Sequence, residues 1–380
     1  MLKILNNIKI VDLTSVVLGP YATQILADLG ADVIKIEPPE GDIFRYVGPS
    51  RSNGMGAGFL NINKNKRSIC LNLKRKEEYD SLIDHIKNAD VFIHNMRPKA
   101  AERLGISHEH ISAINSEIVY CAATGFGADG VYADKPAYDD IIQAESGIAW
   151  LAGAQNGRPQ YVPTVLADKI AALFAAQSIL AGIVHKLRTG EGSNIHVPMF
   201  ECLASFLLSE HIAEKAFDPK NGKAGYTRML SKNRRPFETS DSFITVMPYS
   251  GKHWKSLFEL LGTQDSILSS LAMDDHERSK NIDRLYSHIS GKFISRTTND
   301  WIELLEQHDV PCGRTNTLDD LFTNPHLLSV QFFETYLHPS EGVVTTTRHP
   351  VSFIGSLQSE NSPPPKLGAH NSDSKSSNEN

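Results

Sequence analysis

Cysteine is scarce in this sequence. The 380 residues contain four cysteines, at positions 70, 121, 202 and 312, and no two are close enough to form a CxxC pair. This spacing excludes a disulfide scaffold and the common thiolate metal and redox motifs. We expect reduced thiols in a cytoplasmic protein without a metal site. Cys121 lies in an apolar segment, so a buried structural thiol is favoured over a thioester nucleophile.

Long hydrophobic runs are also missing. The most apolar stretch, residues 171–184, is interrupted by Gln177 and Ser178 and is shorter than a bilayer span. The first residues, MLKILNNIKIVDL, have no long apolar region and no small-residue cleavage site. We therefore expect no signal peptide and no membrane association, and a buried helix around residue 175.

Positive charge is not in excess. The chain has 38 Lys and Arg against 44 Asp and Glu, a formal net charge of −6. Proteins that bind nucleic acids in general are usually basic, so this class is disfavoured. The apolar fraction of 41% and the charged fraction of 22% are typical of globular proteins. A chain of this length usually forms about two domains.

Strand and helix patterns alternate in the first third of the chain. Gly19-Pro20 is expected to break the chain before a helix over 21–29, and other helices are expected over 77–88 and 98–104. Short β-branched runs predict strands over 8–13, 33–36, 91–94 and 118–122. This alternation predicts an α/β domain with a parallel sheet that helices cover on both faces.

The pattern changes after the middle of the chain. A long helix is predicted over 164–188 and a strand over 194–197, and beyond about residue 215 the loops become rich in Lys, Gly and Pro. One strand (243–247) and three helices (253–261, 283–293, 299–308) then predict a smaller α+β domain. We predict a large domain over 1–215, a small domain over 216–330, a return to the large domain over 331–367 and a disordered polar tail over 368–380.

Two short motifs suggest chemistry that their context does not support. Residues 125–130 fit GxGxxG, but a loop containing Pro136 follows where a nucleotide-binding helix would begin, so a plain loop is favoured. His108 and His110 flank Glu109, but metalloprotease ligands lie four residues apart. With Ser107 as a helix cap before them, a solvated helix start is favoured over a metal site.

Two other features leave two interpretations open. Residues 64–76 contain six basic side chains and no acid, and Arg97, Lys99 and Arg103 follow one structural unit later. This concentration fits either a phosphate-rich ligand or a solvated strand edge with helix starts. Asp168 near the start of the long helix fits either a helix cap or a nucleophilic carboxylate that the helix N-terminus keeps ionised.

Taken together, four segments resemble the class III CoA-transferases, the family that also contains the α-methylacyl-CoA racemases. The segments are VVLGPYATQILADLGADVIKIEPPEGDIFR (16–45), NKNKRSICLNLK (63–74), ADVFIHNMRPKAAERLGI (89–106) and VPCGRTNTLDDLFTNPHL (310–327). Asp168 falls where the family has its catalytic aspartate. The resemblance covers about residues 5–355. It implies a Rossmann-like large domain with a smaller α+β domain, and a homodimer of two interlocked chains.

The resemblance also implies roles for individual residues. The aspartate would attack an acyl-CoA thioester, pass through an anhydride and an enzyme–CoA thioester, and hand CoA to a carboxylic acid. CoA would be a substrate, and no permanently bound cofactor is expected. Lys135, Tyr138 and Asp139 would lie toward the acyl end. The residues expected to contact the coenzyme are Ser15, Val16, Val17, Leu71, Asn95, Met96 and Arg103, with Lys66 and Arg67 from the basic run.

Two other activities remain possible at this stage. A racemase of the family needs a histidine before the aspartate of an HD pair, and here the pair is Tyr138-Asp139. A tyrosine, whose ordinary pKa is about 10, is a poor base at neutral pH, which favours a transferase. A CoA-binding protein without turnover is the other alternative. For the substrate, Arg234 and Arg235 suggest either recognition of a second carboxylate, as in succinate, or a solvated charge pair at a domain linker.

Overall fold

The computed structural model describes residues 1–355, 357 and 360–374. It divides into two compact units. The first, called the large unit here, contains residues 1–147, 162–206 and 328–380, and the second, the small unit, contains 148–161 and 207–327. The change of unit therefore comes near residue 206 rather than 215, and the short segment 148–161 belongs with the small unit.

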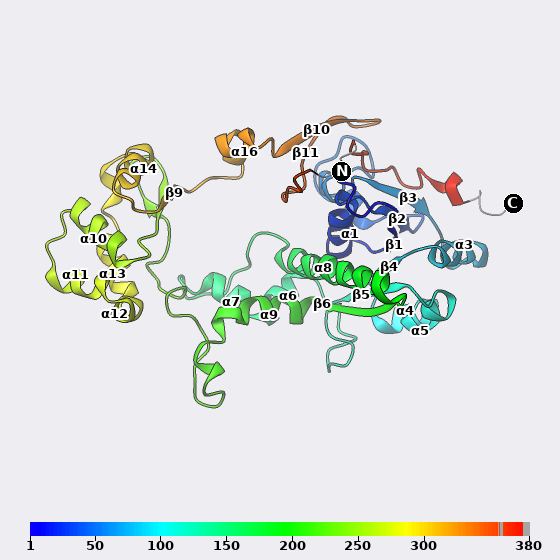
Figure 1. Ribbon diagram of the computed structural model, residues 1–380, viewed down its shortest axis with the longest axis horizontal. Coiled ribbons are helices and arrows are strands. Elements are labelled where there is room, and N and C mark those ends of the chain that lie inside the picture. The colour runs from blue at the N-terminus through cyan, green and yellow to red at the C-terminus, as the bar shows by residue number, and fades with distance from the viewer. Residues whose placement is uncertain (356, 358–359, 375–380) are drawn as a thin grey trace. The chain divides into compact units, whose positions relative to one another are not determined.

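The large unit contains a six-stranded sheet in the order β3-β2-β1-β4-β5-β6, with every neighbouring pair parallel (Figure 1). The α/β class with a parallel sheet is confirmed. Its strands are β1 (Lys9–Leu13), β2 (Asp32–Glu37), β3 (Lys66–Cys70), β4 (Val91–His94), β5 (Val119–Thr124) and β6 (Ser193–Pro198).

Helices connect these strands and cover the sheet. They are α1 (Leu18–Asp28), η1 (Ile43–Tyr46), α2 (Ala57–Ile62), α3 (Lys76–Lys87), α4 (Pro98–Leu104), α5 (His108–Ile114), α6 (Asp139–Ser146) and α8 (Leu166–Thr189). The sequence predicted that Gly19 and Pro20 precede the helix, but both residues lie in the first turn of α1. Proline is tolerated there because its missing N–H would have no partner within the helix.

Apolar side chains from the strands and the helices form a shared core. One cluster combines Val11 and Phe92 from the central strands with Leu82 and Ile86 from α3. On α8, buried small residues such as Ala171 and Ala175 let this helix pack against α1, β5 and β6. Among the described residues, α8 is the one helix whose length and composition would suit a membrane span, but 44% of that window is buried inside the protein.

The C-terminal return completes the large unit. The antiparallel hairpin β10 (Phe333–His338) and β11 (Gly342–Thr347) is followed by a segment that reaches the edge of β3 and ends in η4 (Asn371–Ser374). There the N–H of His370 donates to the carbonyl oxygen of Ser68, and the N–H of Cys70 donates to Asn371 Oδ1. The prediction of a disordered tail is wrong for these residues, because they satisfy the free backbone groups of an edge strand. Residues 375–380 lie outside the described part.

The small unit is an α+β structure around an antiparallel sheet in the order β7-β8-β9. Its core contains Trp254, Phe293 and Trp301. The predicted helix over 283–293 is shorter, since α13 ends at Ile289. The elements are α7 (Ile148–Gly153), the end of α9 (Met199–His211), η2 (Ala213–Ala216), β7 (Phe237–Glu238), β8 (Phe243–Val246), α10 (Gly251–Leu260), α11 (Ser266–Met273), α12 (Asp275–Lys280), α13 (Ile282–Ile289), η3 (Phe293–Ser295), α14 (Thr298–Gln307), β9 (Cys312–Arg314), α15 (Asp320–Thr323) and α16 (Pro325–Ser329).

Candidate active site

The loops that follow β1 and β4 are joined by a pair of hydrogen bonds. The N–H of Ser15 donates to Asn95 Oδ1 at 3.1 Å, and Asn95 Nδ2 donates to the carbonyl oxygen of Ser15 at 2.9 Å. β1 and β4 are neighbours, and the strand order reverses between them. In open parallel sheets, ligands bind outside the carboxyl ends of the strands at such a point. The structure thus brings Ser15 and Asn95 together where a coenzyme would bind.

The next residue, Val16, has an unusual backbone. Its φ is 71°, a left-handed conformation that is costly for a β-branched side chain. Its N–H donates to both carboxylate oxygens of Asp42, at 3.0 and 3.2 Å. Asp42 also accepts the N–H of Phe44 at the start of η1. This carboxylate therefore holds the strained turn against the loop that follows β2.

Buried charges lie beneath this turn. The ammonium group of Lys35 lies 3.0 Å from Asp42 and donates to the carbonyl oxygen of Thr14 at 2.7 Å. Asp12 accepts hydrogen bonds from the N–H and the hydroxyl of Thr14. Burial alone would raise the pKa of Asp12, but Lys66, Lys35 and the hydroxyl donors hold it below its ordinary value. The backbone at residues 14–16 is thus held by fixed side chains before any ligand binds.

A histidine at the end of β4 holds the second loop. His94 Nδ1 accepts the N–H of Met96 at 3.2 Å, and its Nε2 lies 2.6 Å from the hydroxyl of Tyr120. That hydroxyl donates to the carbonyl oxygen of Ile106 at 3.0 Å. Burial, with a smaller contribution from His196, lowers the pKa of His94 to about 4. His94 is therefore neutral at physiological pH. Sequence reasoning missed it, because it looks like an ordinary strand residue.

The other residues expected to contact the coenzyme divide into two groups. Leu71 follows β3 and is buried, Val17 is buried before α1, and Arg103 is exposed on α4. These residues come from loops or helices that follow the strands. Lys66 and Arg67, by contrast, begin β3 and so start at the amino ends of the parallel strands.

Lys66 is enclosed in the protein. Its ammonium group donates to the carbonyl oxygen of Pro20, Thr23 Oγ1 and Asn63 Oδ1 at 2.8 to 2.9 Å, and it lies 3.4 Å from Asp12. With these partners and no exposed surface, the side chain stabilises the packing of α1 on the sheet. We therefore leave Lys66 out of the coenzyme site proposed below.

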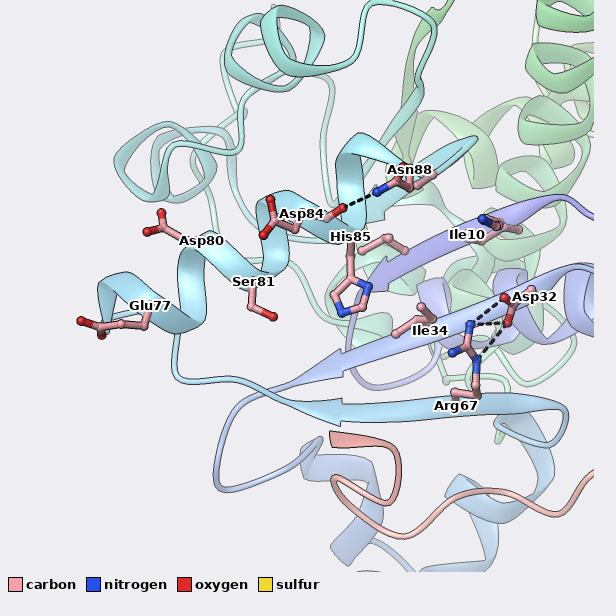
Figure 2. Close-up of a pocket in the computed structure, with 13 residues that line it drawn as sticks. Ile10, Asp32, Ile34, Arg67, Glu77, Asp80, Ser81, Asp84, His85 and Asn88 are labelled. Carbon is pink, nitrogen blue, oxygen red and sulfur yellow. Dashed lines mark hydrogen bonds and ion pairs between the residues drawn. The ribbon is translucent and has the colours of Figure 1, made fainter. Parts of the chain in front are cut away.

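Arg67 lies beside a cavity of about 470 Å³ at the amino ends of β1 and β2, and Figure 2 shows its guanidinium facing Asp32. Two guanidinium nitrogens lie 2.6 to 3.0 Å from that carboxylate. α3 adds Glu77, Asp80 and Asp84 to the lining. The lining thus has four carboxylates against the cations Lys9 and Arg67, a charge balance that disfavours a phosphate.

Asp168 lies in the first turn of α8, where Asp139 contacts its backbone. Asp139 begins α6, and its Oδ1 accepts the N–H of Asp168 at 3.0 Å. Asp139 Oδ2 accepts a hydrogen bond from Gln143 Nε2 at 2.6 Å. Gln143 also bonds both backbone groups of Val162 and the carbonyl oxygen of Thr164. One turn of α6 thus holds the backbone at the start of α8.

The protonation of Asp168 differs from the expectation. Burial, and then the nearby negative charge of Asp139, raise the pKa of Asp168 to about 7. The sequence suggested that the helix N-terminus would keep this carboxylate ionised. Burial, the larger of the two causes, acts against this effect of the helix N-terminus. A raised pKa in a carboxylate of this kind is typical of functional sites.

The loop before α6 carries the remaining acyl-site candidates. Tyr138 and Lys135 are exposed, and the ammonium group of Lys135 lies 3.4 Å from the ring centre of Tyr132. Asp134 pairs with Lys99 at 2.6 Å, which links this loop to α4. The structure therefore places Asp139 in contact with Asp168 and leaves Lys135 and Tyr138 on the surface.

The motifs that were set aside have structural roles. No helix begins among the glycines of residues 125–130, and the N–H of Gly127 donates to Glu201 at 2.9 Å. Burial raises the pKa of Cys121 to about 12, so its thiolate is not accessible. Ser107 bonds His110 rather than a backbone N–H. In the part of the chain that the structure describes, no three His, Cys, Asp or Glu side chains gather as a metal site.

Comparison with known proteins identifies the family of this chain. The family described as CoA-transferase family III matches residues 5–371. The chain belongs to this family. It is 30% identical over 374 residues to human succinyl-CoA:glutarate CoA-transferase, covering 97% of this chain and 84% of that protein.

Two further comparisons support membership of this family. Succinyl-CoA:mesaconate CoA-transferase of Haloarcula marismortui is 27% identical over 376 residues, covering 96% of this chain and 94% of the relative. The crystal structure of a CaiB/BaiF family protein from Brucella suis superposes with a TM-score of 0.82 at 28% identity and covers 98% of each chain. The resemblance found in the sequence segments is confirmed. The protein is an enzyme that uses CoA thioesters.

Proposed function

We propose that Asp168 is the nucleophile of an acyl-CoA:carboxylate CoA-transferase. The observation that supports this most directly is a carboxylate in the first turn of α8, with its backbone N–H held by Asp139 and its pKa raised to about 7. A partly desolvated carboxylate is a better nucleophile than one in water, and a fixed backbone favours attack in one direction.

The reaction would proceed in four balanced steps. Asp168 attacks the thioester carbonyl, forms a mixed anhydride and releases CoA thiolate. The thiolate attacks the aspartyl carbonyl, which releases the donor acid and leaves an aspartyl-CoA thioester. The acceptor carboxylate then attacks this thioester to give a second anhydride and free thiolate. Attack of the thiolate on the acceptor acyl carbon forms the new CoA ester and regenerates Asp168.

The turn after β1 is the proposed coenzyme site. Ser15, Val16, Val17, Asn95 and Met96 lie on the two loops at the strand-order reversal, with their backbone fixed by Asn95, Asp42 and His94. Leu71 and Arg103 would extend this surface, and Arg103 supplies an exposed cation for a phosphate. Lys135 and Tyr138 would face the acyl group, and the residue before Asp139 is not a histidine, which supports transfer over racemisation.

A trapping experiment tests the nucleophile. After incubation with succinyl-CoA, borohydride reduces an aspartyl-CoA thioester to homoserine, and peptide mass spectrometry shows which residue changed. We expect homoserine at position 168 and a loss of at least about a thousandfold in transfer for Asp168→Ala. Asp140→Ala, at an exposed neighbouring acid of α6, is the matched control. It should retain both the formation of homoserine at position 168 and the transfer activity. A modified residue elsewhere, or transfer retained in Asp168→Ala, would refute the proposal.

We also infer that two copies of the chain associate. Leu173, Val184 and Leu187 leave apolar surface exposed along the long helix α8, and a second copy would cover such a surface. The resemblance suggests an interlocked arrangement. Light scattering on a sizing column should give about 84 kDa, twice the chain mass of 42.0 kDa. A mass of one chain at micromolar concentration would contradict this.

A further inference from the structure

Residues 361–371, called the C-terminal segment here, reach the edge strand β3 within the large unit. Three consecutive prolines at 363–365 restrict the backbone of this segment, because each ring fixes φ and removes an N–H donor. Before the prolines, the N–H of Ser362 donates to Asn65 Oδ1 at 2.7 Å, and the N–H of Asn65 donates to the carbonyl oxygen of Ser362 at 3.0 Å. The large unit therefore fixes the path of the segment.

Two groups of the C-terminal segment bind the partners of a buried carboxylate, Glu37. The N–H of Gly368 donates to Ser68 Oγ at 3.0 Å, and this hydroxyl donates to Glu37 Oε1 at 2.6 Å. The carbonyl oxygen of Pro365 accepts a hydrogen bond from Arg45 Nη2 at 3.2 Å, and the same nitrogen donates to Glu37 Oε1 at 2.7 Å. The segment thus contacts both donors that meet at one oxygen of Glu37, although Gly368 lies 300 residues after Ser68 in the chain.

The other oxygen of Glu37 connects to the turn after β1. Glu37 Oε2 accepts the N–H of Asp42 at 3.1 Å. The carboxylate of Asp42 in turn accepts the N–H of Val16, the residue whose φ is 71°. An unbroken series of hydrogen bonds therefore joins the C-terminal segment to the strained turn of the proposed coenzyme site.

Glu37 and Arg45 form a buried ion pair at the centre of this series, and each side chain is 1% exposed. Burial alone would raise the pKa of Glu37, but hydrogen bonds from Arg45 and the charge of Lys35 hold it below its ordinary value. The attraction within a buried pair is offset by the cost of removing both charges from water. Two parallel bonds from the guanidinium, at 2.7 Å each, nevertheless leave the carboxylate a single orientation. The pair is thus suited to fixing the loop after β2.

We propose that the C-terminal segment positions the turn at Val16 for the coenzyme, with Ser68 and Glu37 as positioning residues. This rests on the proposed coenzyme site and adds that the end of the chain holds that site in its binding conformation. Ser68 and Glu37 are both buried, so they act through Asp42 rather than on the substrate. Loosening the series lets the strained turn relax, which weakens the binding of acyl-CoA more than it slows the reaction of the bound complex.

Ser68→Ala interrupts the series with little change in side-chain size. We expect the KM for acyl-CoA to rise at least about threefold, with kcat within about twofold of the wild-type value. Asn371→Ala is the matched control, because it removes a contact between the same segment and β3, at the N–H of Cys70, that does not lead to Glu37. The KM of this control should stay at the wild-type value. Glu37→Gln is less suitable, since it leaves Arg45 buried without a charged partner.

Two further measurements separate positioning from a general loss of stability. Hydrogen exchange followed by mass spectrometry should show faster exchange in peptides that contain Val16 for Ser68→Ala, but not for Asn371→Ala. In the Asp42→Asn background the turn has already lost its support, so adding Ser68→Ala should raise KM by less than about twofold. Unchanged exchange at Val16 in Ser68→Ala, or effects on KM that multiply in the double variant, would overturn the proposal.

The positioning role and the transferase function can fail separately. Calorimetric titration with CoA measures coenzyme binding whether or not transfer occurs. Wild-type affinity for CoA in Ser68→Ala would refute the positioning role while the transferase function stands. A weaker affinity in Ser68→Ala, together with wild-type affinity in Asn371→Ala, would support the positioning role even if no transfer to a carboxylic acid is observed.

Discussion

Two basic segments of equal charge have opposite surroundings in this protein. Residues 64–76 contain six cations, and five of them pair with carboxylates: Lys64 with Asp28, Lys66 with Asp12, Arg67 with Asp32, Arg75 with Glu78 and Lys76 with Asp80. Residues 219–237 of the small unit also contain six cations and no acid, and among the described residues none of their arginines pairs with a carboxylate. The charges of the first segment are mostly neutralised by neighbouring carboxylates, whereas the arginines of the second have no such partner in the part of the chain that the structure describes.

This difference teaches that charge density in a sequence does not reveal function. Three of the five partners, Asp12, Asp28 and Asp32, lie on β1, α1 and β2, more than 30 residues earlier in the chain. Only the folded sheet shows that these charges are already neutralised. A cation without a partner is the more informative observation, because burial without compensation is costly and needs a reason.

The largest effect should come from breaking a buried pair in the first segment. Lys66→Met leaves Asp12 buried without its nearest cation, so we expect the free energy of unfolding to fall by about 3 kcal/mol. Arg228→Met removes a cation that has no carboxylate partner among the residues that the structure describes, and we expect a change below about 0.5 kcal/mol. Urea denaturation of both variants measures the difference.

An exposed pair provides the control for this comparison. Lys76→Met removes a solvent-exposed partner of Asp80 on α3 and should leave the urea midpoint of unfolding at the wild-type value. If Arg228→Met destabilised the protein as much as Lys66→Met, Arg228 would be a structural residue. The contrast between the two segments would then be lost.

Much of the large unit could be predicted from the sequence, and the failures have a common cause. The strands β1, β2, β4, β5 and β6 were predicted because their residues are apolar and β-branched. β3 was not predicted, since its sequence KRSIC begins with two charges whose partners lie on distant elements. The tail after residue 367 was misjudged for the same reason, because its polar residues pair with an edge strand that local sequence does not show.

The residues of the candidate site divide in the same way, into those that were predicted from the sequence and those whose role depends on a distant partner. Asp168 and the two loops of the proposed coenzyme site were predicted from the resemblance to a family, whereas Asp42 and His94 were not predicted at all. Their roles depend on where their side chains meet another loop: Asp42 bonds the N–H of Val16, and His94 bonds the N–H of Met96. The positive φ of Val16 gives no signal in a sequence, because valine is the residue least expected there.

A smaller effect should come from loosening the coenzyme turn. Asp42→Asn retains the size of the side chain but weakens its bonds to Val16 and Lys35, so the strained turn loses its support. We expect the KM for acyl-CoA to rise about tenfold, with kcat within about threefold. Asp32→Asn is the matched control. Its partner Arg67 lies at the amino ends of the strands, whereas the Val16 turn follows the carboxyl end of β1, so the KM of this variant should stay at the wild-type value. Equal KM values in the two variants would show that the Val16 turn does not position the coenzyme.

The smallest effect concerns the two carboxylates of the proposed active site, Asp139 and Asp168, which repeat the contrast between satisfied and unsatisfied charges. Asp139 accepts hydrogen bonds from Gln143 and from the N–H of Asp168, whereas burial and Asp139 raise the pKa of Asp168 to about 7. In the proposed mechanism the attacking form is the carboxylate, so the rate of the first step should rise with pH through about 7 and then level off. Asp139→Asn removes the like charge but leaves the burial, so the midpoint should move down by about one unit. At pH 6 the variant should then show a larger fraction of its own maximal rate than the wild type does. An unchanged midpoint, measured from single-turnover rates between pH 5 and 9, would mean that burial alone sets the protonation of Asp168, and that Asp139 acts only through the hydrogen bond to its backbone.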